Sequence, residues 1–441
     1  MLELDGLQLL RVVVALSLLC QCSSHTPSRS GGAAGQDPTS GDGGDPGSGG
    51  SSVINGGAAG DSTSGGGTKG GVGNGGRAGA EASGGSGGSG GGGGSVDPST
   101  FMFGADISSV QEAIDGGATY VDTDGDEKSL LEILGNHGFN YIRLRTFVDP
   151  DALYGYANPN GQAQFRKAES YCDTEHTLAQ ALEVKQAGMG FLLDLHYSDN
   201  WADPGKQIIP TAWRDASSIT ELAARVGDYT QTVVAALVEG GARPDMVQIG
   251  NEITPGLLIH VPAANPDPDQ WGNITKVTNS VNGSTASFAN VATLLKAASD
   301  AVKAVDPTIK VMLHVENTKN FPAVRNYVQQ VQSRGVVLDV LGLSCYTTYQ
   351  GQPALWEDTF QQLTTNLPDI SFTIAEYNPE RTRANEIMHD LPDGRGLGTF
   401  FWEPTQSGAW GNALFTFTGD AYTANKADFA EIDALRPTLG L

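Results

Sequence analysis

The stretch Val247–Glu252, which reads VQIGNE, is an apolar run of strand character that ends in a carboxylate. A second run, Phe372–Glu376 (FTIAE), ends in the same way, and 124 residues separate the two glutamates (376 − 252). A carboxylate at the end of a buried strand is costly unless it is paired or has a function. Two such strand ends predict a pair of acids that meet at one end of a barrel.

Outward from these two runs, strand-length apolar segments alternate with helical patterns over residues 98–441. Strands are predicted at Phe101–Ile107, Tyr141–Phe147, Gly190–Tyr197, Met246–Ile253, Lys310–Asn317, Asp339–Tyr346, Ser371–Asn378 and Leu397–Glu403. Helices are predicted at Leu130–His137, Thr177–Ala187, Ile219–Val238, Ala289–Val305, Pro322–Ser333 and Ala354–Thr365. Eight strands that alternate with helices favour an α/β fold, a (β/α)8 TIM barrel, over an open sheet.

The segment Leu257–Phe288 follows the fourth predicted strand and is long and polar. We predict that it forms a surface loop. Loops at the carboxyl ends of barrel strands build the binding cleft of barrel enzymes, so this segment is expected near the site.

Residues 31–97 consist almost entirely of Gly, Ser, Ala, Asp and Thr. Such a composition cannot bury enough apolar surface to offset the entropy of ordering the chain. The sequence therefore predicts a disordered Gly/Ser-rich tether over residues 25–97, followed by a catalytic domain over residues 98–441.

Residues 1–24 resemble a secretory signal, because Arg11 precedes a short apolar core and then small polar residues. The apolar core is too short for a transmembrane span. Cys20 and Cys22 are candidates for lipid attachment, as in a bacterial lipoprotein. We therefore expect a protein that is secreted or anchored at the cell surface.

Deleting residues 1–97 should leave a soluble, folded and active domain, because the tether offers no core to lose. Thermal unfolding of residues 98–441 checks this expectation. Loss of a cooperative transition would place the domain boundary elsewhere.

The net charge of −24 argues against a nucleic-acid partner, which requires basic surface. It also disfavours a polyanionic substrate, so a neutral ligand is the simpler expectation. The alternative is that the acidity only keeps a secreted protein soluble. No cofactor is predicted, and the protein is expected to be a monomer.

Evidence for a metal site is thin. The seven histidines are scattered without zinc spacing. The segment Asp122–Glu127 is similar to a calcium loop, but its Gly125 comes two places too early, and Ile133 stands where the bidentate glutamate belongs. A solvated acidic turn is the preferred interpretation, with calcium left open. Cys172 and Cys345 are too few for a disulfide framework and are predicted to be buried.

Glycoside hydrolysis uses two carboxyl groups, which in retaining enzymes lie ~5–5.5 Å apart. Glu252 and Glu376 could form this pair if their strands face each other across the barrel mouth. Asn251 could then donate a hydrogen bond to a sugar hydroxyl. The structural alternative is that either glutamate only pairs with a barrel arginine such as Arg143 or Arg145.

The stretch Leu193–Gln207 (LDLHYSDNWADPGKQ) resembles the signature of glycoside hydrolase family 53, the arabinogalactan endo-beta-1,4-galactanases. Other blocks of that family match in order at Gly104–Ser108, Tyr141–Arg145, Gly250–Ile253 and Phe401–Pro404. The resemblance spans residues 101–404.

This resemblance implies a barrel of the large retaining clan, clan A, with Glu252 as the acid/base and Glu376 as the nucleophile. Arg145 would keep the nucleophile ionised, Tyr346 would hydrogen-bond to the same carboxylate, and Trp402 would form a floor for the sugar ring. The residues expected to bind substrate are Asp106, Arg145, Asp194, His196, Trp201, Asn251, Tyr346 and Trp402. The leading hypothesis is a secreted retaining endo-glycosidase that cuts beta-1,4-galactan side chains of pectin.

Two departures from the family pattern keep alternatives open. Cys345 takes the place of the first of two adjacent tyrosines that follow Gly-Leu-Ser in the block of the sixth strand. The block around Glu376 is also atypical, which makes Glu380 the fallback nucleophile. The protein could therefore act on another beta-linked polysaccharide, such as mannan, another galactan or a glucan. A non-catalytic carbohydrate-binding surface protein is the alternative from a different class.

Overall fold

The structure, a computed structural model, describes residues 100–157, 170–263, 274–378, 380–405, 413–419 and 421–441. The predicted leader, the tether and the lipidation candidates Cys20 and Cys22 lie outside the described residues. Within the described part of the chain, no helix combines the length and apolarity needed to cross a membrane.

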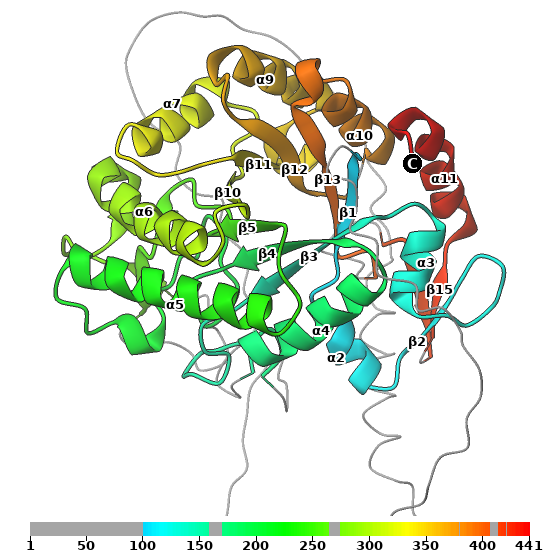
Figure 1. Ribbon diagram of the computed structural model, residues 1–441, viewed down its shortest axis with the longest axis horizontal. Helices are drawn as coiled ribbons and strands as arrows, with labels where there is room; N and C mark the ends of the chain where they lie inside the picture. The colour runs from blue at the N-terminus through cyan, green and yellow to red at the C-terminus, as the bar shows by residue number, and fades with distance from the viewer. Residues whose placement is uncertain (1–99, 158–169, 264–273, 379, 406–412, 420) are drawn as a thin grey trace, which may run out of the picture. The chain divides into compact units, whose positions relative to one another are not determined.

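Eight parallel strands close into a barrel in the order β1-β13-β12-β11-β10-β5-β4-β3 (Figure 1). They are β1 (Met102–Asp106), β3 (Tyr141–Thr146), β4 (Gly190–Leu195), β5 (Met246–Ile249), β10 (Lys310–Val315), β11 (Val340–Cys345), β12 (Ser371–Tyr377) and β13 (Gly396–Trp402). The predicted TIM barrel is confirmed, and each barrel strand overlaps one predicted strand. The largest difference is at β5, which ends at Ile249 because Gly250 turns the chain with φ +98°.

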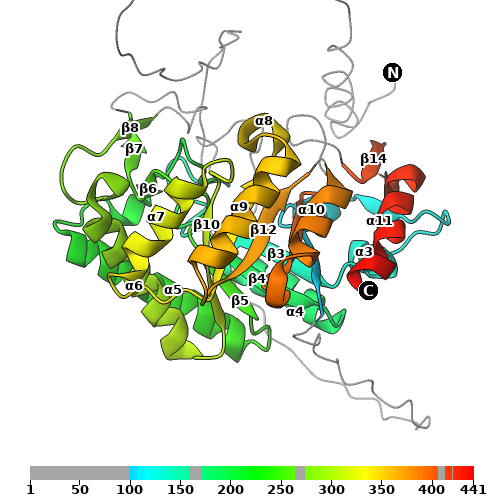
Figure 2. The same cartoon turned by 90° about the horizontal axis from the view of Figure 1, so that it is seen from above.

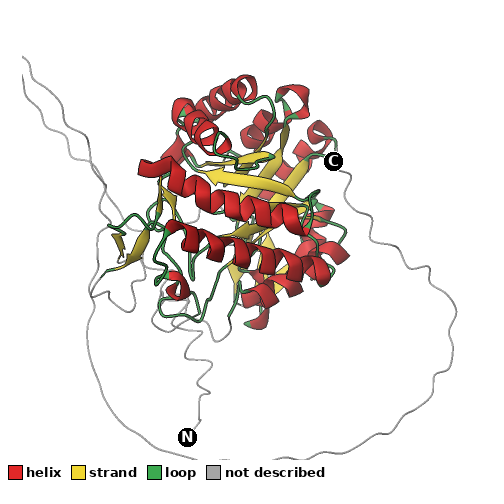
Figure 3. Ribbon diagram, turned by 60° about the vertical axis from the view of Figure 1, so that its left-hand side comes forward, coloured by secondary structure: helices red, strands yellow, loops and turns green. Residues whose placement is uncertain are grey.

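Helices surround the strands on the outside of the barrel (Figure 2 and Figure 3). They are α2 (Val110–Asp115), α3 (Leu130–Asn136), α4 (Thr174–Gln186), α5 (Ile219–Glu239), α6 (Phe288–Val305), α7 (Phe321–Gln332), α8 (Thr347–Gln350), α9 (Pro353–Asn366), α10 (Arg381–His389) and α11 (Lys426–Leu439). Side-chain caps fix where several of them begin. Ser218 accepts the backbone N–H of Glu221 at the start of α5, and Asp173 accepts that of His176 at the start of α4.

The barrel interior consists of an apolar ring below a polar layer. Each barrel strand contributes one residue to the ring: Met102, Tyr141, Leu192, Met246, Met312, Val340, Ala375 and Phe400. Side chains two positions apart point to the same face of a strand. Two positions further along four of these strands, the interior residues are Arg143, Asp194, Gln248 and His314, all fully buried. The apolar ring closes the barrel floor, and the polar layer carries the site.

A β-bulge re-aims the end of β12. Leu343 of β11 is paired with Ile374, but the next residue, Ser344, is paired with Glu376, so that Ala375 is skipped. Ala375 and Glu376 consequently both face the interior, the first in the apolar ring and the second in the polar layer. Without the bulge, strict alternation would turn Glu376 toward the helices.

The described part of the predicted surface loop Leu257–Phe288 lies mostly at the surface, as predicted, but it is not entirely loop and its start is buried. It forms two short antiparallel pairs, β6 (Gly256–Leu257) with β9 (Gly283–Ser284) and β7 (His260–Pro262) with β8 (Ile274–Lys276). Leu257 and Leu258 belong to the main hydrophobic core, which explains why the start of the segment does not lie on the surface.

A small three-stranded sheet was not predicted. It consists of β14 (Phe415–Thr418), β15 (Ala421–Ala424) and β2 (Thr119–Val121). Tyr120 stacks on Tyr422 with ring centroids 5.2 Å apart. The strands are too short to give a clear periodic signal in the sequence.

Candidate active site

Arg143 lies at the centre of the polar layer and is fully buried. Its Nη1 donates to Asp106 Oδ2 at 2.9 Å, and its Nη2 donates to Asp194 Oδ2 at 2.8 Å and to Asn251 Oδ1 at 2.9 Å. Its Nε donates to Gln248 Oε1 at 3.2 Å. Because these partners come from β1, β4 and the end of β5, the guanidinium fixes three strand ends relative to one another.

Arg143, and not Arg145, is the cation beside Glu376. Nη1 of Arg143 lies 3.0 Å from Glu376 Oε1, and the Tyr346 hydroxyl donates to Glu376 Oε2 at 3.1 Å. The predicted pairing of Arg145 with Glu376 is wrong, because Arg145 Nη1 donates to Glu403 Oε1 at 2.7 Å. Both arginines face the barrel interior from β3, but Arg145 lies one step nearer the strand end, where Glu403 follows β13.

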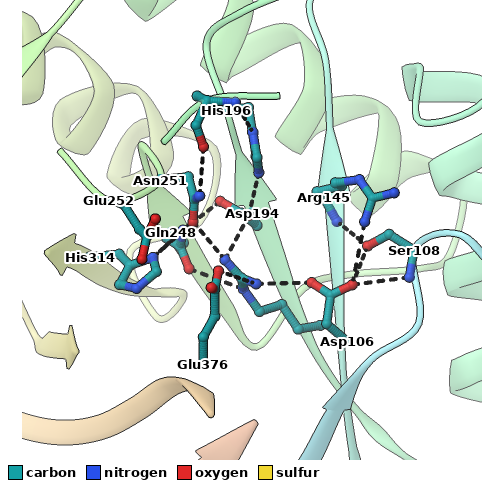
Figure 4. Close-up of polar contacts among 12 residues, drawn as sticks. Asp106, Ser108, Arg145, Asp194, His196, Gln248, Asn251, Glu252, His314 and Glu376 are labelled. Carbon is teal, nitrogen blue, oxygen red and sulfur yellow. Dashed lines mark hydrogen bonds and ion pairs between the residues drawn. The ribbon is translucent and has the colours of Figure 1, made fainter. Parts of the chain in front are cut away.

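Glu252 has a hydroxyl rather than a guanidinium as its partner. Its Oε1 lies 2.6 Å from Ser344 Oγ. Ser344 is also the residue paired with Glu376 between β11 and β12, so one residue ties both glutamates together. In Figure 4, Glu252 and Glu376 lie beside the same cluster of polar side chains, which includes Asp194, Gln248 and Asn251. The backbone of Glu252 is left-handed with φ +49°, a strained conformation of the kind found at functional sites.

The two glutamates differ in proton affinity. Burial and the neighbouring Glu376 raise the pKa of Glu252 well above its usual value. Burial also raises the pKa of Glu376, to about 7, while Arg143 and Tyr346 act in the opposite direction. The pair therefore holds its proton on Glu252, because, among the described residues, Glu376 is the one of the two with a guanidinium beside it. The arrangement holds one acid and one carboxylate at the same pH.

Replacing Tyr346 with Phe should move the acid limb of the activity profile to higher pH. The hydroxyl stabilises ionised Glu376, so its loss raises the pKa of that carboxylate and leaves more of it protonated at low pH. The shift should be up to about one pH unit, since a single hydrogen bond contributes ~0.5–1.5 kcal/mol. The measurement is kcat/KM against pH, and an unchanged acid limb would separate Tyr346 from the titration of Glu376.

Two tryptophans lie beside the buried arginines of the site. The ring centroids of Trp201 and Trp402 are 5.9 Å apart at an interplanar angle of 64°. The guanidinium of Arg145 lies 3.9 Å from the centroid of the Trp201 ring, and that of Arg143 lies 5.6 Å from the centroid of Trp402. These cation–π contacts hold the rings in place, and Trp402 is the residue that ends β13.

Several of the predicted substrate-binding residues are enclosed by protein. Asp106, Asp194 and His196 have exposed fractions of 1%, 0% and 1%. His196 Nδ1 accepts the backbone N–H of Ala202 at 3.0 Å, and its Nε2 faces Asp194 Oδ2 at 3.0 Å. In this structure these side chains position Arg143 and the segment after β4, and a direct contact with substrate stays a prediction.

Several polar residues of the site were missed in the sequence: Gln248, His314, Ser344 and Glu403. Glu403 is buried, with Oε2 accepting the Ser109 hydroxyl at 2.6 Å and Oε1 bound to Arg145. A usable signal was present, because each of these residues is polar and lies in or directly after an otherwise apolar strand. Glu380, the fallback nucleophile, is exposed and precedes α10, beyond the end of β12.

The predicted solvated acidic turn is confirmed for residues 124–127, which are exposed. Asp122 differs, because it is buried and contacts Lys128 Nζ at 2.7 Å and His137 Nε2 at 3.0 Å. In the described part of the chain, no group of three or more His, Cys, Asp or Glu residues is placed to hold a metal ion. Cys172 and Cys345 are free and buried, as expected.

A closed parallel barrel whose strand ends hold such a carboxylate pair defines the class of barrel glycoside hydrolases. Residues 102–385 match the sequence profile of glycosyl hydrolase family 53. The chain is 30% identical over 374 residues to an uncharacterized protein of Niallia circulans, with 74% of this chain and 94% of that protein covered. It is 29% identical over 336 residues to a probable arabinogalactan endo-beta-1,4-galactanase A of Aspergillus tubingensis, with 68% and 84% covered.

A solved catalytic domain of family 53 from Ignisphaera aggregans is 29% identical, with a TM-score of 0.60 and coverage of 77% of this chain and 97% of that one. A fungal beta-1,4-galactanase structure, 24% identical, has a TM-score of 0.61 with 76% and 99% covered, and supports the fold. The chain belongs to glycosyl hydrolase family 53 and is a glycoside hydrolase.

Proposed function

We propose that the protein is a retaining endo-beta-1,4-galactanase that uses Glu376 as the nucleophile and Glu252 as the acid/base. The observation that carries the proposal is the unequal environment of the two glutamates. Arg143 and Tyr346 stabilise negative charge on Glu376, whereas Glu252 lies against a hydroxyl and keeps the proton.

In the first step, Glu376 attacks the anomeric carbon and forms a glycosyl ester, while Glu252 donates its proton to the departing glycosidic oxygen. In the second step, ionised Glu252 removes a proton from water, which attacks the same carbon and releases Glu376. Two inversions leave the beta configuration intact. The Arg143 guanidinium acts throughout as the fixed positive charge beside the nucleophile.

The substrate class follows from the relatives and is consistent with the site. Curated proteins 27–29% identical to this chain are named arabinogalactan endo-beta-1,4-galactanases. A net charge of −24 suits a neutral polymer. Trp402, whose ring lies beside the Arg143 guanidinium that pairs with Glu376, suits the apolar face of a galactose ring. Beta-1,4-galactan, as in the side chains of pectin, is therefore the proposed substrate.

A panel of polysaccharides tests the substrate. Beta-1,4-galactan should yield reducing ends and short oligosaccharides, with a rapid fall in polymer size that marks internal cleavage. Beta-1,3-galactan, mannan and beta-glucan should react at least ~100-fold more slowly, as expected when a site rejects sugars whose hydroxyls it leaves unpaired. Faster release from mannan or glucan would move the proposal to that polymer, and no release from any would favour a binding protein.

We also infer that the protein is exported, since residues 11–24 have the pattern of a secretory leader. Export gives the enzyme access to a polymer too large to enter a cell. Fractionation of cells that express the full chain should find activity in the medium or at the surface. Activity confined to the cytoplasm would contradict this inference.

A further inference from the structure

Four side chains form a continuous run of contacts that ends at Glu252. His314 Nδ1 lies 2.8 Å from Asn251 Oδ1, His314 Nε2 lies 2.9 Å from Ser344 Oγ, and Ser344 Oγ lies 2.6 Å from Glu252 Oε1. His314 and Ser344 are fully buried, so no bulk solvent competes for these contacts. Figure 4 shows His314 beside Asn251 and Glu252. The direction of each hydrogen bond follows from the donors and acceptors available.

The first direction is fixed by Arg143, which can only donate. Its Nη2 contacts Asn251 Oδ1 at 2.9 Å, and Asn251 Nδ2 donates to the carbonyl of Ala202 at 2.9 Å, so the contacted atom is the amide oxygen. An oxygen cannot donate to His314, and Nδ1 must therefore carry the hydrogen. Gln248 Nε2, 3.2 Å from the same Nδ1, has closer acceptors in Asp194 Oδ1 at 2.6 Å and Asn251 Oδ1 at 3.1 Å.

The second direction follows because His314 is neutral. Burial and the positive charge of Arg143 lower its pKa well below the usual value, against the opposing effect of Asp194, and His196 acts in the same direction as Arg143. With the hydrogen on Nδ1, Nε2 is a bare acceptor. The Ser344 hydroxyl must donate to it. Since Ser344 has a single hydrogen, its oxygen can then only accept from Glu252.

We propose that Asn251, His314 and Ser344 are positioning residues that hold the catalytic proton on Glu252. This inference rests on the proposed role of Glu252 as the acid. When Glu252 is protonated, its O–H donates to Ser344 and the Ser344 O–H donates to His314, so each contact of the run has one donor and one acceptor. After Glu252 gives its proton to the leaving oxygen, Ser344 rotates to donate to the carboxylate, and His314 Nε2 loses its partner. Asn251, His314 and Ser344 themselves neither gain nor lose a proton.

The charged groups that face Glu252 also favour its protonated form. Glu376, Glu316 and Asp203 all raise the pKa of Glu252. They make an ionised Glu252 less favourable, but they do not depend on the direction of the Ser344 hydrogen bond. A test must therefore distinguish the effect of the hydrogen bonds among Asn251, His314, Ser344 and Glu252, here called the relay, from the effect of these negative charges.

Replacing Ser344 with Ala distinguishes the effect of its hydrogen bonds from that of the nearby negative charges, by the sign of the change in the pKa of Glu252. The ionised state loses one charge-assisted hydrogen bond to the carboxylate. The protonated state loses its bond to Ser344 and also the bond that pairs the buried Nε2 of His314, an acceptor that the ionised state leaves unpaired. Since an unpaired buried acceptor costs more than an ordinary hydrogen bond gains, the protonated state loses more, and the pKa of Glu252 should fall. The alkaline limb of kcat/KM on galactan should move to lower pH by up to about one unit. If Ser344 merely donated to an ionised Glu252, its removal would raise that pKa and move the limb to higher pH. A shift upward, or none, overturns the inference.

Ser299→Ala is the matched control, because Ser299 is a fully buried serine of α6 that bonds to the carbonyl of Lys296. It should leave the alkaline limb in place. The state of His314 provides a second readout that does not depend on activity. Nitrogen-15 NMR of the imidazole should show a neutral ring with the hydrogen on Nδ1 from pH 5 to 8. An imidazolium, or a hydrogen on Nε2, overturns the relay even if the enzyme cleaves galactan as proposed.

Discussion

Replacing Glu376 with Ala should reduce turnover of beta-1,4-galactan by ~10⁴-fold or more, because removal of a nucleophile leaves only binding and the remaining site groups. The fold should be retained, since Glu376 belongs to the polar layer and not to the apolar ring. Loss of this carboxylate leaves Arg143 paired with Asp106 and Asp194. Reducing-end release from galactan measures the effect.

Adding azide tests whether the loss of activity comes from the missing nucleophile. It should occupy the space of the missing carboxylate and restore activity on an activated aryl beta-galactooligosaccharide, with an alpha-glycosyl azide as product. Glu380→Ala is the control, because that residue is exposed and lies past β12. If the Glu380→Ala variant were inactive and the Glu376→Ala variant active, the nucleophile would be Glu380.

Replacing Glu252 with Gln should reduce turnover of galactan by ~10²–10⁴-fold, since an amide cannot supply a proton to the leaving oxygen. Gln keeps the shape of Glu and can still contact Ser344, so thermal unfolding should change little. Steady-state kinetics on the polymer gives the size of the loss.

An aryl oligogalactoside with a good leaving group should lose much less in its first step, because that group departs without protonation. The variant should then accumulate the glycosyl ester, which intact-protein mass spectrometry detects as an added mass. Near-normal turnover of galactan by Glu252→Gln would remove Glu252 from the acid/base role.

The barrel was predictable because the local pattern of apolar residues indicates alternating strands and helices. Glu252 was predictable for the same reason, as a carboxylate at the end of such a strand. Strict alternation, however, would turn Glu376 outward beside Ile374. The bulge that skips Ala375 brings it inward, and a bulge depends on pairing between strands that the sequence does not display.

The choice between Arg143 and Arg145 was beyond the sequence. Both occupy inward positions of β3, two residues apart, and the same alternation describes them equally. Their partners depend on how far neighbouring strands are staggered around the barrel. Arg143 reaches Glu376, whereas Arg145 reaches Glu403, which the sequence showed only as part of a matched block.

The central claim is that Glu376 attacks the sugar directly while Glu252 supplies and removes the proton. Proton NMR of the first products released from beta-1,4-galactan tests it most directly. Double displacement predicts that the beta anomer appears first and that the alpha anomer grows in only by mutarotation. Initial release of the alpha anomer would show single displacement by water and would contradict the assignment of Glu376 as the nucleophile.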